Sequence, residues 1–345
     1  MKNVIQSSEY CTVGHPDRTC DYIASYILDR YLERDKRSRV ALEVQLKDNY
    51  CTVSGEVTSK ANFTPDEIAS FCREALEEIG YTKEYQERFG AENVISTGNL
   101  EVVTHISNQS GDIAQGVDAD GWGDQGIFFG LAVDDPATGY LPKDYFLARK
   151  LAQEVAGKFG GLDVKTLVTL ENDTPIECYV AIPLLPHDAE SPIRLAAERI
   201  IGKDVDVIIN GTGRYVKHGS IGDCGTTGRK LVVDFYGGNS KIGGGSPWGK
   251  DPSKADVSLN ILARKYALEG MKRYGYPEMR SAISCCIGRK EIRVTLFDRD
   301  GGQVESRVES APASHVIEEL GLTKGDFALR CKRGLFGYEK LAYPA

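Results

Sequence analysis

Residues 39–58 read RVALEVQLKDNYCTVSGEVT, and this stretch decides the class of fold. From Val40 to Leu46 every second residue is aliphatic, which is the period of a half-buried strand. A short polar turn then leads into a second strand with the same alternation. The stretch therefore predicts a β-hairpin with Glu43 and Glu56 on the face away from the aliphatic side chains.

Helix signals flank this hairpin. On its amino-terminal side, residues 20–31 carry an apolar stripe with helical spacing. On its carboxyl-terminal side, Thr64 and Glu67 form a capping box, and Gly80 ends the helix that follows. Further helices are expected at about 143–158, 192–201 and 252–274, and strands near 164–171, 176–183, 205–209, 230–236, 279–287 and 290–298. This order predicts an α+β fold with helices covering one face of mostly antiparallel sheets.

Composition and charge exclude several classes of protein. The chain has 345 residues, 41% of them hydrophobic, and a formal net charge of −8. Ordinary globular usage argues against disorder, and the acidic balance argues against nucleic acid or an anionic membrane as the main partner. No run approaches the roughly 18 apolar residues of a membrane helix, so we expect a cytoplasmic protein. The nine cysteines are scattered, which favours reduced thiols over disulfides or a zinc site.

Four glycine-rich clusters combine glycine with an acidic residue, and three of them also contain a cation; they lie at 14–18, 121–126, 222–230 and 243–251. A plain turn would explain any one of them. Polyphosphate bound with magnesium needs this same mixture, because carboxylates hold the metal, lysine or arginine meets phosphate oxygens, and glycine lets backbone amides approach. Four clusters of matching chemistry therefore favour a polyphosphate site.

Two of these clusters imitate better-known nucleotide motifs. The glycines of 121–126 fit G-x-G-x-x-G, but the apolar run 127–133 follows them where a dinucleotide-binding fold has a helix. Residues 244–250 nearly spell a P-loop, but Asp251 stands where a serine or threonine would bind magnesium. Neither motif is predicted to work in its usual way.

Two basic side chains, His15 and Lys254, lie where helices are expected to begin. His15 precedes Pro16, so a phosphate could meet both its imidazole and the helix amides; a capping histidine is the alternative. Lys254 is expected in the first turn of a helix opened by Pro252, where a cation opposes the positive end of the helix dipole. A bound anion would remove that mismatch, and a solvated lysine is the alternative.

The sequence contains no Ser-His-Asp or Cys-His nucleophile signature and no metal-binding histidine motif. The chemistry is therefore expected to need no covalent enzyme intermediate.

Together the clusters resemble the S-adenosylmethionine synthetases (methionine adenosyltransferases). The matching segments follow in family order: GHPD at 14–17, GDQG at 123–126, GDCGTTGRKLVVDFYGG at 222–238, the glycine-lysine run at 243–256 and SCCIG at 284–288. The resemblance implies transfer of the adenosyl group of ATP to the sulfur of L-methionine, then hydrolysis of the triphosphate to phosphate and diphosphate. It implies three similarly built α+β domains, which we expect at 1–100, 109–217 and 218–345.

The resemblance also implies cofactors, partners and roles for single residues. Magnesium, two ions per site, and potassium are the implied cofactors, and a homodimer or dimer of dimers with active sites at the interface is the implied assembly. The implied polyphosphate ligands are His15, Lys165, Arg229, Lys230 and Lys250, with Asp17 and Asp256 for magnesium and Glu43 for potassium. Methionine would be surrounded by Glu56, Gln109, Asp124, Lys254 and Ile287, and the nucleotide by Asp163, Arg214, Tyr215, Asp223 and Ser246.

The chain departs from the family pattern at three places near these residues, one of which is Thr12-Val13 in place of the usual Ser-Glu. Arg18 stands where the family usually has lysine, and Ser246-Pro247-Trp248 replaces the common Ala-Phe-Ser. A related transferase that uses another thioether or another nucleoside triphosphate is therefore the alternative enzyme. A non-catalytic nucleotide-binding subunit is the alternative from a different class, but it predicts a broken set of charged residues.

Overall fold

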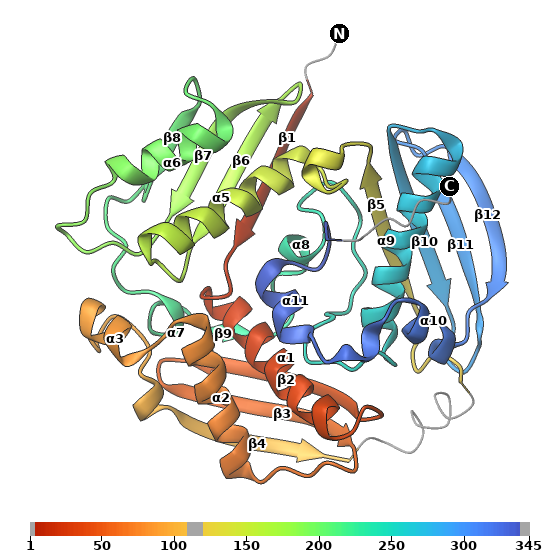
Figure 1. Cartoon of the computed structure of the whole chain (residues 1–345), viewed down its shortest axis with the longest axis horizontal. Helices are drawn as coiled ribbons and strands as arrows, with labels where there is room; N and C mark the ends of the chain where they lie inside the picture. Colours follow the sequence, from red (N-terminus) through yellow and green to blue (C-terminus); the bar gives the residue numbers. More distant parts are fainter. Residues whose placement is uncertain (1–3, 109–119, 339–345) are drawn as a thin grey trace.

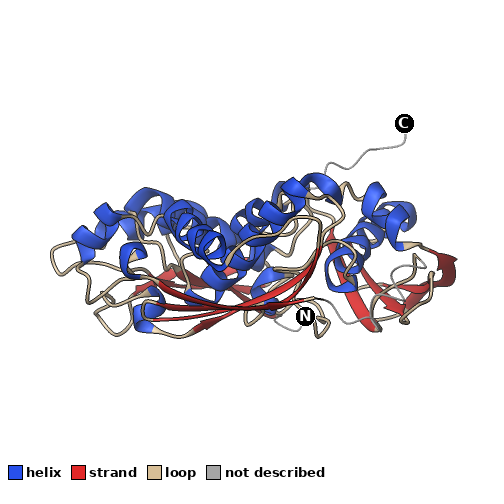
Figure 2. Cartoon of the chain, turned by 90° about the horizontal axis from the view of Figure 1, so that it is seen from below, coloured by secondary structure: helices blue, strands red, loops and turns tan. Residues whose placement is uncertain are grey.

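The computed structural model describes residues 4–108 and 120–338 and contains three four-stranded sheets, whose helices lie on one side (Figures 1 and 2). The first sheet has the order β1 (Ile5–Cys11), β6 (Lys165–Glu171), β7 (Thr174–Ala181), β8 (Asp206–Ile209). The second has the order β4 (Glu101–Ser107), β3 (Tyr50–Thr58), β2 (Arg39–Lys47), β9 (Gly225–Thr226). The third has the order β12 (Gln303–Ser310), β11 (Glu291–Phe297), β10 (Glu278–Cys285), β5 (Gly126–Val133). All pairings of these strands are antiparallel except β3–β4 and β7–β8.

Each sheet has its own helices on the covered face. Helices α5 (Lys143–Phe159) and α6 (Ser191–Ile201) pack on the first sheet, and α1 (Pro16–Arg34) and α2 (Pro65–Ile79) pack on the second. Helices α9 (Ala255–Tyr274) and α10 (Ala313–Glu319) accompany the third. The shorter helices are α3 (Lys83–Phe89), α7 (Gly219–Gly222), α8 (Leu231–Asp234) and α11 (Phe327–Arg333), with 3-10 turns at Thr97–Asn99, Pro136–Thr138 and Leu322–Lys324. The fold is therefore α+β, as the sequence predicts.

The hairpin at 39–58 is confirmed. Its strands pair from Arg39 with Thr58 to Lys47 with Tyr50, around a turn in which Asp48 has φ of 53°. The aliphatic side chains of Val40, Leu42, Val44 and Leu46 are buried. The opposite face of the sheet is open, and it carries Glu43 and Glu56.

The three sheets exchange strands. β1 comes from the amino-terminal end of the chain but lies in the sheet of β6 to β8. β5 lies in the sheet of β10 to β12, and β9 lies beside β2. In each sheet, one strand therefore comes from a different predicted domain range than the strands beside it. The ranges 1–100, 109–217 and 218–345 themselves remain a prediction.

Two local predictions are wrong. The expected strand at 230–236 contains helix α8 instead, because Asp234 N donates to Lys230 O at 2.9 Å in place of a sheet partner. The helix expected at 252–274 begins at Ala255. Asp251 Oδ2 accepts the amide of Ser253 at 2.9 Å, which makes this segment a turn, and Lys254 becomes the N-cap.

In the described part of the chain, no helix is both long enough and apolar enough to cross a membrane.

Candidate active site

Asp17, in the first turn of α1, forms the centre of one group of charged residues. It is 1% exposed, and its Oδ1 accepts the amide of Thr226 at 2.9 Å. Arg229 Nε lies 3.3 Å from the same oxygen, and Lys230 Nζ pairs with Oδ2. A single buried carboxylate therefore holds two cations that follow β9 in the chain.

His15 is the N-cap of α1, directly before Asp17. Its Nδ1 accepts the amide of Asp17 at 3.2 Å, so a neutral ring carries its proton on Nε2 and can donate from there. Burial lowers the pKa of His15 to about 4, and the charges of Lys230 and Lys165 act in the same direction. His15 lies at the helix start as expected, and its ring caps the helix, which was the alternative role; binding of phosphate by His15 stays a prediction.

Lys165 begins β6 and points to the open face of the first sheet. Its Nζ lies 2.7 Å from Glu9 Oε2, on the neighbouring strand β1. Because the charges of Lys165 and Asp223 both act on His15, these three side chains and Asp17 lie in one neighbourhood.

Asp163 lies on the loop before β6 and is 5% exposed. Its Oδ2 accepts a hydrogen bond from the Gly219 amide at 2.9 Å, and the hydroxyl of Tyr215 donates a hydrogen bond to the same carboxylate. Burial raises the pKa of Asp163 to about 6, an effect to which Asp223 adds. Arg214, the neighbour of Tyr215, is exposed. We call the residues gathered here the Asp17 group: His15, Asp17, Asp163, Lys165, Tyr215, Asp223, Arg229 and Lys230.

A second collection of charges surrounds the start of α9. Lys250 Nζ lies 2.6 Å from Asp256 Oδ2, and Lys254 Nζ lies 3.4 Å from Asp251 Oδ1. Lys254 therefore has a carboxylate partner at the helix start. Asp251 Oδ1 also accepts the amide of Val40 at 2.8 Å, which fixes this segment to the edge of β2.

The open face of β2 and β3 completes this second collection. Partial burial raises the pKa of Glu43, the Lys250 ammonium opposes this rise, and the carboxylates of Asp256 and Glu56 add to it. The four side chains therefore act on one another. We call Glu43, Glu56, Lys250, Lys254 and Asp256 the Lys250 group.

Asp124 and Ile287 lie together at one end of the third sheet. Trp122 and Ile287 form an isolated bridge, and Asp124 O accepts the thiol of Cys285 at 3.5 Å. Burial raises the pKa of Cys285 to about 11, with smaller contributions from the charges of Asp124 and Asp256. This end of the sheet therefore lies beside the Lys250 group. Gln109 is outside the described residues.

The loop 243–250 runs between the two groups. Gly245 lies against the carboxylate of Asp256, so closely that an added Cβ would overlap it. Ser246 is 8% exposed and packs against Gly228, where a Cβ would lie 3.0 Å from the Ser246 Cβ. Across residues 4–108 and 120–338, however, no hydrogen bond or ion pair joins the Asp17 group to the Lys250 group.

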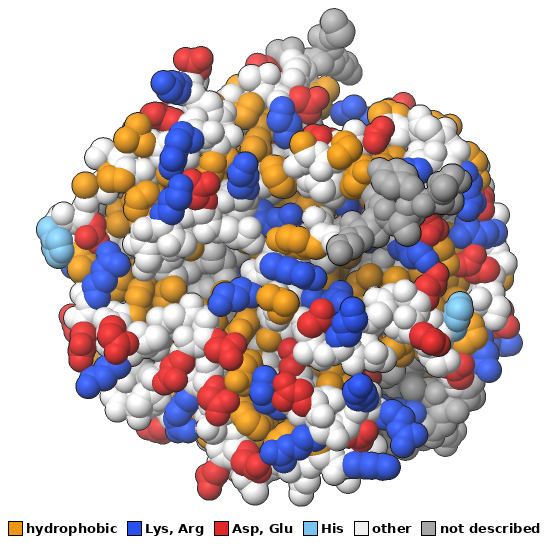
Figure 3. All heavy atoms as spheres, viewed as in Figure 1, with side chains coloured by type: hydrophobic (Ala, Val, Ile, Leu, Met, Phe, Trp, Pro, Cys, Tyr) orange, Lys and Arg blue, Asp and Glu red, His pale blue; other side chains and the backbone are white. Residues whose placement is uncertain are grey.

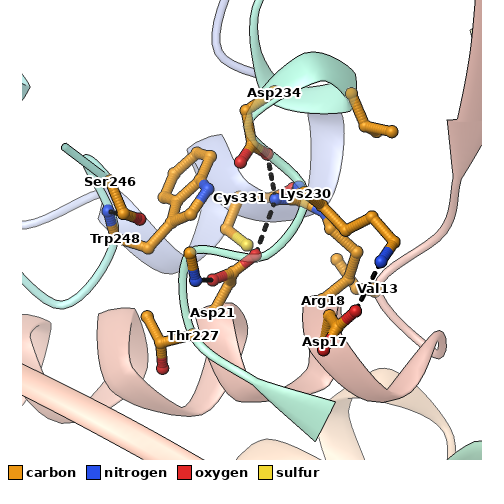
Figure 4. Close-up of polar contacts among 12 residues, drawn as sticks. Val13, Asp17, Arg18, Asp21, Thr227, Lys230, Asp234, Ser246, Trp248 and Cys331 are labelled. Atoms are coloured by element: carbon orange, nitrogen blue, oxygen red, sulfur yellow. Dashed lines mark hydrogen bonds and ion pairs between the residues drawn. The ribbon is translucent and has the colours of Figure 1, made fainter. Parts of the chain in front are cut away.

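Behind the Asp17 group lie four residues for which the sequence predicted no role: Arg18, Asp21, Asp234 and Trp248 (Figure 4). Arg18 and Trp248 stood out only as departures from the family pattern, and Asp21 and Asp234 carried no signal. Trp248 is 1% exposed, and the centroid of its ring lies 5.2 Å from Cζ of Arg18. The departure at Trp248 thus lies in the packing behind the site.

The described residues on the helix-covered side of the molecule carry charges of both signs (Figure 3). Figure 3 shows lysine and arginine interspersed with aspartate and glutamate across this face. In the two groups, by contrast, the fold holds Arg229 and four lysines each beside a carboxylate.

Comparison with family models gives two matches. The model of the S-adenosylmethionine synthetase N-terminal domain matches residues 3–111, and the model of the C-terminal domain of the same enzymes matches residues 217–344.

Curated relatives and a solved structure cover nearly the whole chain. The S-adenosylmethionine synthase of Acholeplasma laidlawii is 36% identical over 96% of this chain and 94% of its own length. That of Mesoplasma florum is 32% identical over 98% and 96%. An unusual S-adenosylmethionine synthetase from Campylobacter jejuni superposes with a TM-score of 0.86 at 27% identity, covering 98% of this chain and 97% of its own.

Proposed function

The chain belongs to the S-adenosylmethionine synthetase family and transfers the adenosyl group of ATP to the sulfur of L-methionine, and we propose that the Asp17 and Lys250 groups carry out this reaction. The observation that carries the proposal is the arrangement of Arg229 and Lys230 on one buried carboxylate, with His15 and Lys165 close by. The three cations and the Nε2 donor of His15 suit a substrate with several negative charges.

The polyphosphate of ATP would be bound by His15, Lys165, Arg229, Lys230 and Lys250. His15 would donate from Nε2, because its Nδ1 is occupied by a backbone amide. The lysines and arginine would donate charge-assisted hydrogen bonds, each of which contributes about 1.5–3 kcal/mol. The same cations would hold the triphosphate during its hydrolysis to phosphate and diphosphate.

The proposed reaction needs no general base, because the thioether sulfur of methionine has no proton to lose. Attack on the 5′ carbon of the ribose requires alignment of the sulfur and stabilisation of the leaving triphosphate. This requirement agrees with a site made of cations and carboxylates that has no nucleophile triad.

Asp17 and Asp256 are the proposed magnesium ligands. No cluster of three or more acidic, histidine or cysteine side chains suited to a metal occurs among residues 4–108 and 120–338. Single carboxylates still fit magnesium, which is usually bound by one or two carboxylates plus substrate phosphates. When bound, magnesium would neutralise phosphate charge, and each aspartate already faces the lysine that would share this task.

The remaining assignments follow the two groups. For potassium we propose Glu43, whose carboxylate offers the oxygen that a hard cation prefers. For methionine we propose Glu56 and Lys254, which belong to the Lys250 group, Asp124 and Ile287, which lie beside it, and Gln109. For the nucleotide we propose Asp163, Arg214, Tyr215, Asp223 and Ser246, which lie in or next to the Asp17 group.

We propose that a complete site forms between two copies of the chain. Support comes from the open sheet faces, which carry Lys165, Glu43 and Glu56 from both groups. The same faces expose large apolar side chains: Ile5, Tyr50, Val103, Tyr179 and Ile208, with exposures of 38% to 60%. Apolar surface of this kind is typical of protein interfaces. A homodimer, or a dimer of such dimers, would bring the Asp17 group of one copy to the Lys250 group of the other.

Product identification tests the reaction. Purified protein, ATP, methionine, Mg²⁺ and K⁺ should yield S-adenosylmethionine by mass, and the K230M variant should lose most of this activity while its circular dichroism stays unchanged. Full activity in K230M would contradict the assignment of Lys230.

Subunit complementation tests the shared site. K230M and K250M each disable one group, so either variant alone should be inactive. Co-expressed with different tags, they should recover about a quarter of wild-type activity, because half of the dimers would be mixed and each would hold one intact site. No recovery in purified mixed dimers would mean that each chain holds a complete site.

A further inference from the structure

Arg18 is a buried cation that contacts four separate segments of the chain (Figure 4). Its side chain is 1% exposed, and Nη1 pairs with Asp21 Oδ2 at 3.2 Å and with Asp234. Nη2 donates to the backbone oxygen of Cys331 at 2.7 Å, in α11. The guanidinium also stacks near the ring of Trp248. One side chain thus joins α1, α8, α11 and the loop 243–250.

The two carboxylate partners of Arg18 hold both ends of the segment that carries the polyphosphate cations. Asp21 Oδ1 accepts the amide of Gly228 at 2.8 Å. Asp234 lies in α8 and donates its amide to Lys230 O at 2.9 Å. Arg229 and Lys230 therefore lie between Gly228 and Asp234. Gly228 is bound by Asp21, and both aspartates pair with the Arg18 guanidinium.

Trp248 connects the second loop to the same guanidinium. Its amide donates to Ser246 Oγ at 3.3 Å, and Ser246 packs on Gly228. Two residues later, Lys250 forms an isolated bridge with Ala41. The contact between Trp248 and Arg18 therefore sets where the loop that ends in Lys250 lies relative to Gly228.

Lysine could not reproduce this set of contacts. Arginine offers several donors in a planar fork and stacks on an aromatic face, whereas lysine offers a compact charge. The Asp234 carboxylate has the Trp248 indole N–H as a further neighbour, which opposes the rise that burial causes in its pKa. Arginine at position 18 and tryptophan at position 248 thus belong to one buried unit.

We propose that Arg18 and Trp248 form a positioning pair that holds the Arg229–Lys230 segment and the loop 243–250 in the geometry needed for polyphosphate binding. Neither side chain touches substrate in this proposal, since both are almost completely buried. The inference rests on the proposed role of Arg229 and Lys230 in holding polyphosphate.

The test compares R18K, W248F and the double variant with wild type. Each is assayed for kcat, for the KM of ATP and of methionine, and for the Kd of Mg²⁺-tripolyphosphate by calorimetry, at a temperature where circular dichroism shows a folded chain. We expect R18K to lower kcat and weaken tripolyphosphate binding by about tenfold to a hundredfold, because small displacements of catalytic groups cost this much. The KM of methionine should change less than about twofold, since the displaced groups grip phosphate.

The double variant tests whether the two residues act together. If they form one unit, the loss in R18K/W248F should be clearly smaller than the product of the two single losses. R264K is the matched control, because Arg264 is also 1% exposed, donates to the carbonyls of Tyr140 and Gly139 and lies near the Phe336 ring. It should lower thermal stability and leave kcat and tripolyphosphate binding unchanged.

Three outcomes decide the matter. Losses of stability alone in R18K and W248F, as in R264K, would show a purely structural role and overturn the inference. Multiplicative losses would show that the two residues act independently, which also overturns it. If wild type itself failed to bind tripolyphosphate, or K230M bound it normally, the proposed roles of the cations would fail first, so the two failures are distinguishable.

Discussion

Asp163 is a buried carboxyl whose protonation changes in the range where enzymes are assayed. Burial raises its pKa to about 6, and its partners Tyr215 and Gly219 both donate hydrogen bonds to the charged form. Protonation below that pH would remove the charged acceptor and loosen the loop that holds Tyr215. Residues proposed to bind the nucleotide are thus coupled to pH through one side chain.

We therefore expect the KM of ATP to rise as the pH falls from 7 to 5.5. In D163N the side chain cannot titrate, so its KM should be higher at pH 7 and much less dependent on pH over this range. Initial rates at saturating methionine provide the measurement. A D163N profile parallel to that of wild type would assign the pH dependence to another group.

Burial shifts the pKa of His218 in the opposite direction, and this shift affects stability. It is 1% exposed, its Nε2 lies 2.8 Å from the Tyr85 hydroxyl, and burial lowers its pKa to about 4. Because the folded state disfavours the charged ring, the contribution of His218 is fully present above the unfolded pKa of about 6.5 and is lost as the pH falls toward 4.

The variant H218Q should isolate this effect. Wild type should exceed H218Q in free energy of unfolding at pH 7.5, and the difference should shrink steadily between pH 6.5 and 4. Urea titrations at several pH values measure it. A difference that stays constant with pH would mean that His218 does not carry this linkage.

At the scale of elements, β5 and α9 pack so closely that only glycine fits between them. A Cβ on Gly130 would overlap the backbone carbonyl of Ala263 in α9 and would lie 2.5 Å from Ser281 Oγ. The backbone of a helix cannot move aside as a flexible side chain can. The third sheet therefore depends on this glycine for its contact with its main helix.

G130A should lower the free energy of unfolding by about 1–3 kcal/mol or more, as overpacked cores do. G157A is the matched control, since Gly157 lies inside α5 with nothing within 4 Å of an added Cβ. It should stabilise the chain by about 0.5–1 kcal/mol, because alanine is the better helix former. Denaturant unfolding compares the two, and a G130A chain as stable as wild type would disprove the tight contact.

At the scale of the whole molecule, the exchange of strands ties the three sheets together. β1, β5 and β9 each belong to a sheet whose other strands lie elsewhere in the sequence. Trp248 lies in the core of the first two sheets, and Trp122 lies in the core of the third. These two residues therefore report on different parts of one chain.

We expect the chain to unfold as one cooperative unit. In W122F the remaining tryptophan fluorescence comes from Trp248, and its unfolding midpoint should coincide with that of circular dichroism. Adding G130A, which disturbs the other core, should shift both midpoints equally. A shift seen by circular dichroism alone would mean that the third sheet unfolds independently.

Local sequence was sufficient for the longer helices α1, α2, α5, α6 and α9 and for seven of the strands, because alternation, capping and glycine stops act over a few neighbouring residues. It did not predict β1, β4, β5, β9 or β12. The hairpin at 39–58, the capped helix α2 and strands β10 and β11 needed no distant information. The segment 230–236 could not be predicted this way. Its apolar residues suit a strand, but they form helix α8, whose Asp234 pairs with the distant Arg18.

The family and the kinds of charged residue in its proposed site could be predicted from the sequence alone, because glycine-rich turns and the charges beside them are read directly along the chain. Tertiary structure alone decided which charges meet: Asp17 with Arg229 and Lys230, Lys250 with Asp256, and Arg18 with Asp234 and Trp248. Many of these partners lie more than 200 positions apart, and only the exchange of strands between sheets and the burial of α1 bring them within bonding distance. A pattern along the chain carries no such information, since ion pairs and stacking depend on separation in space.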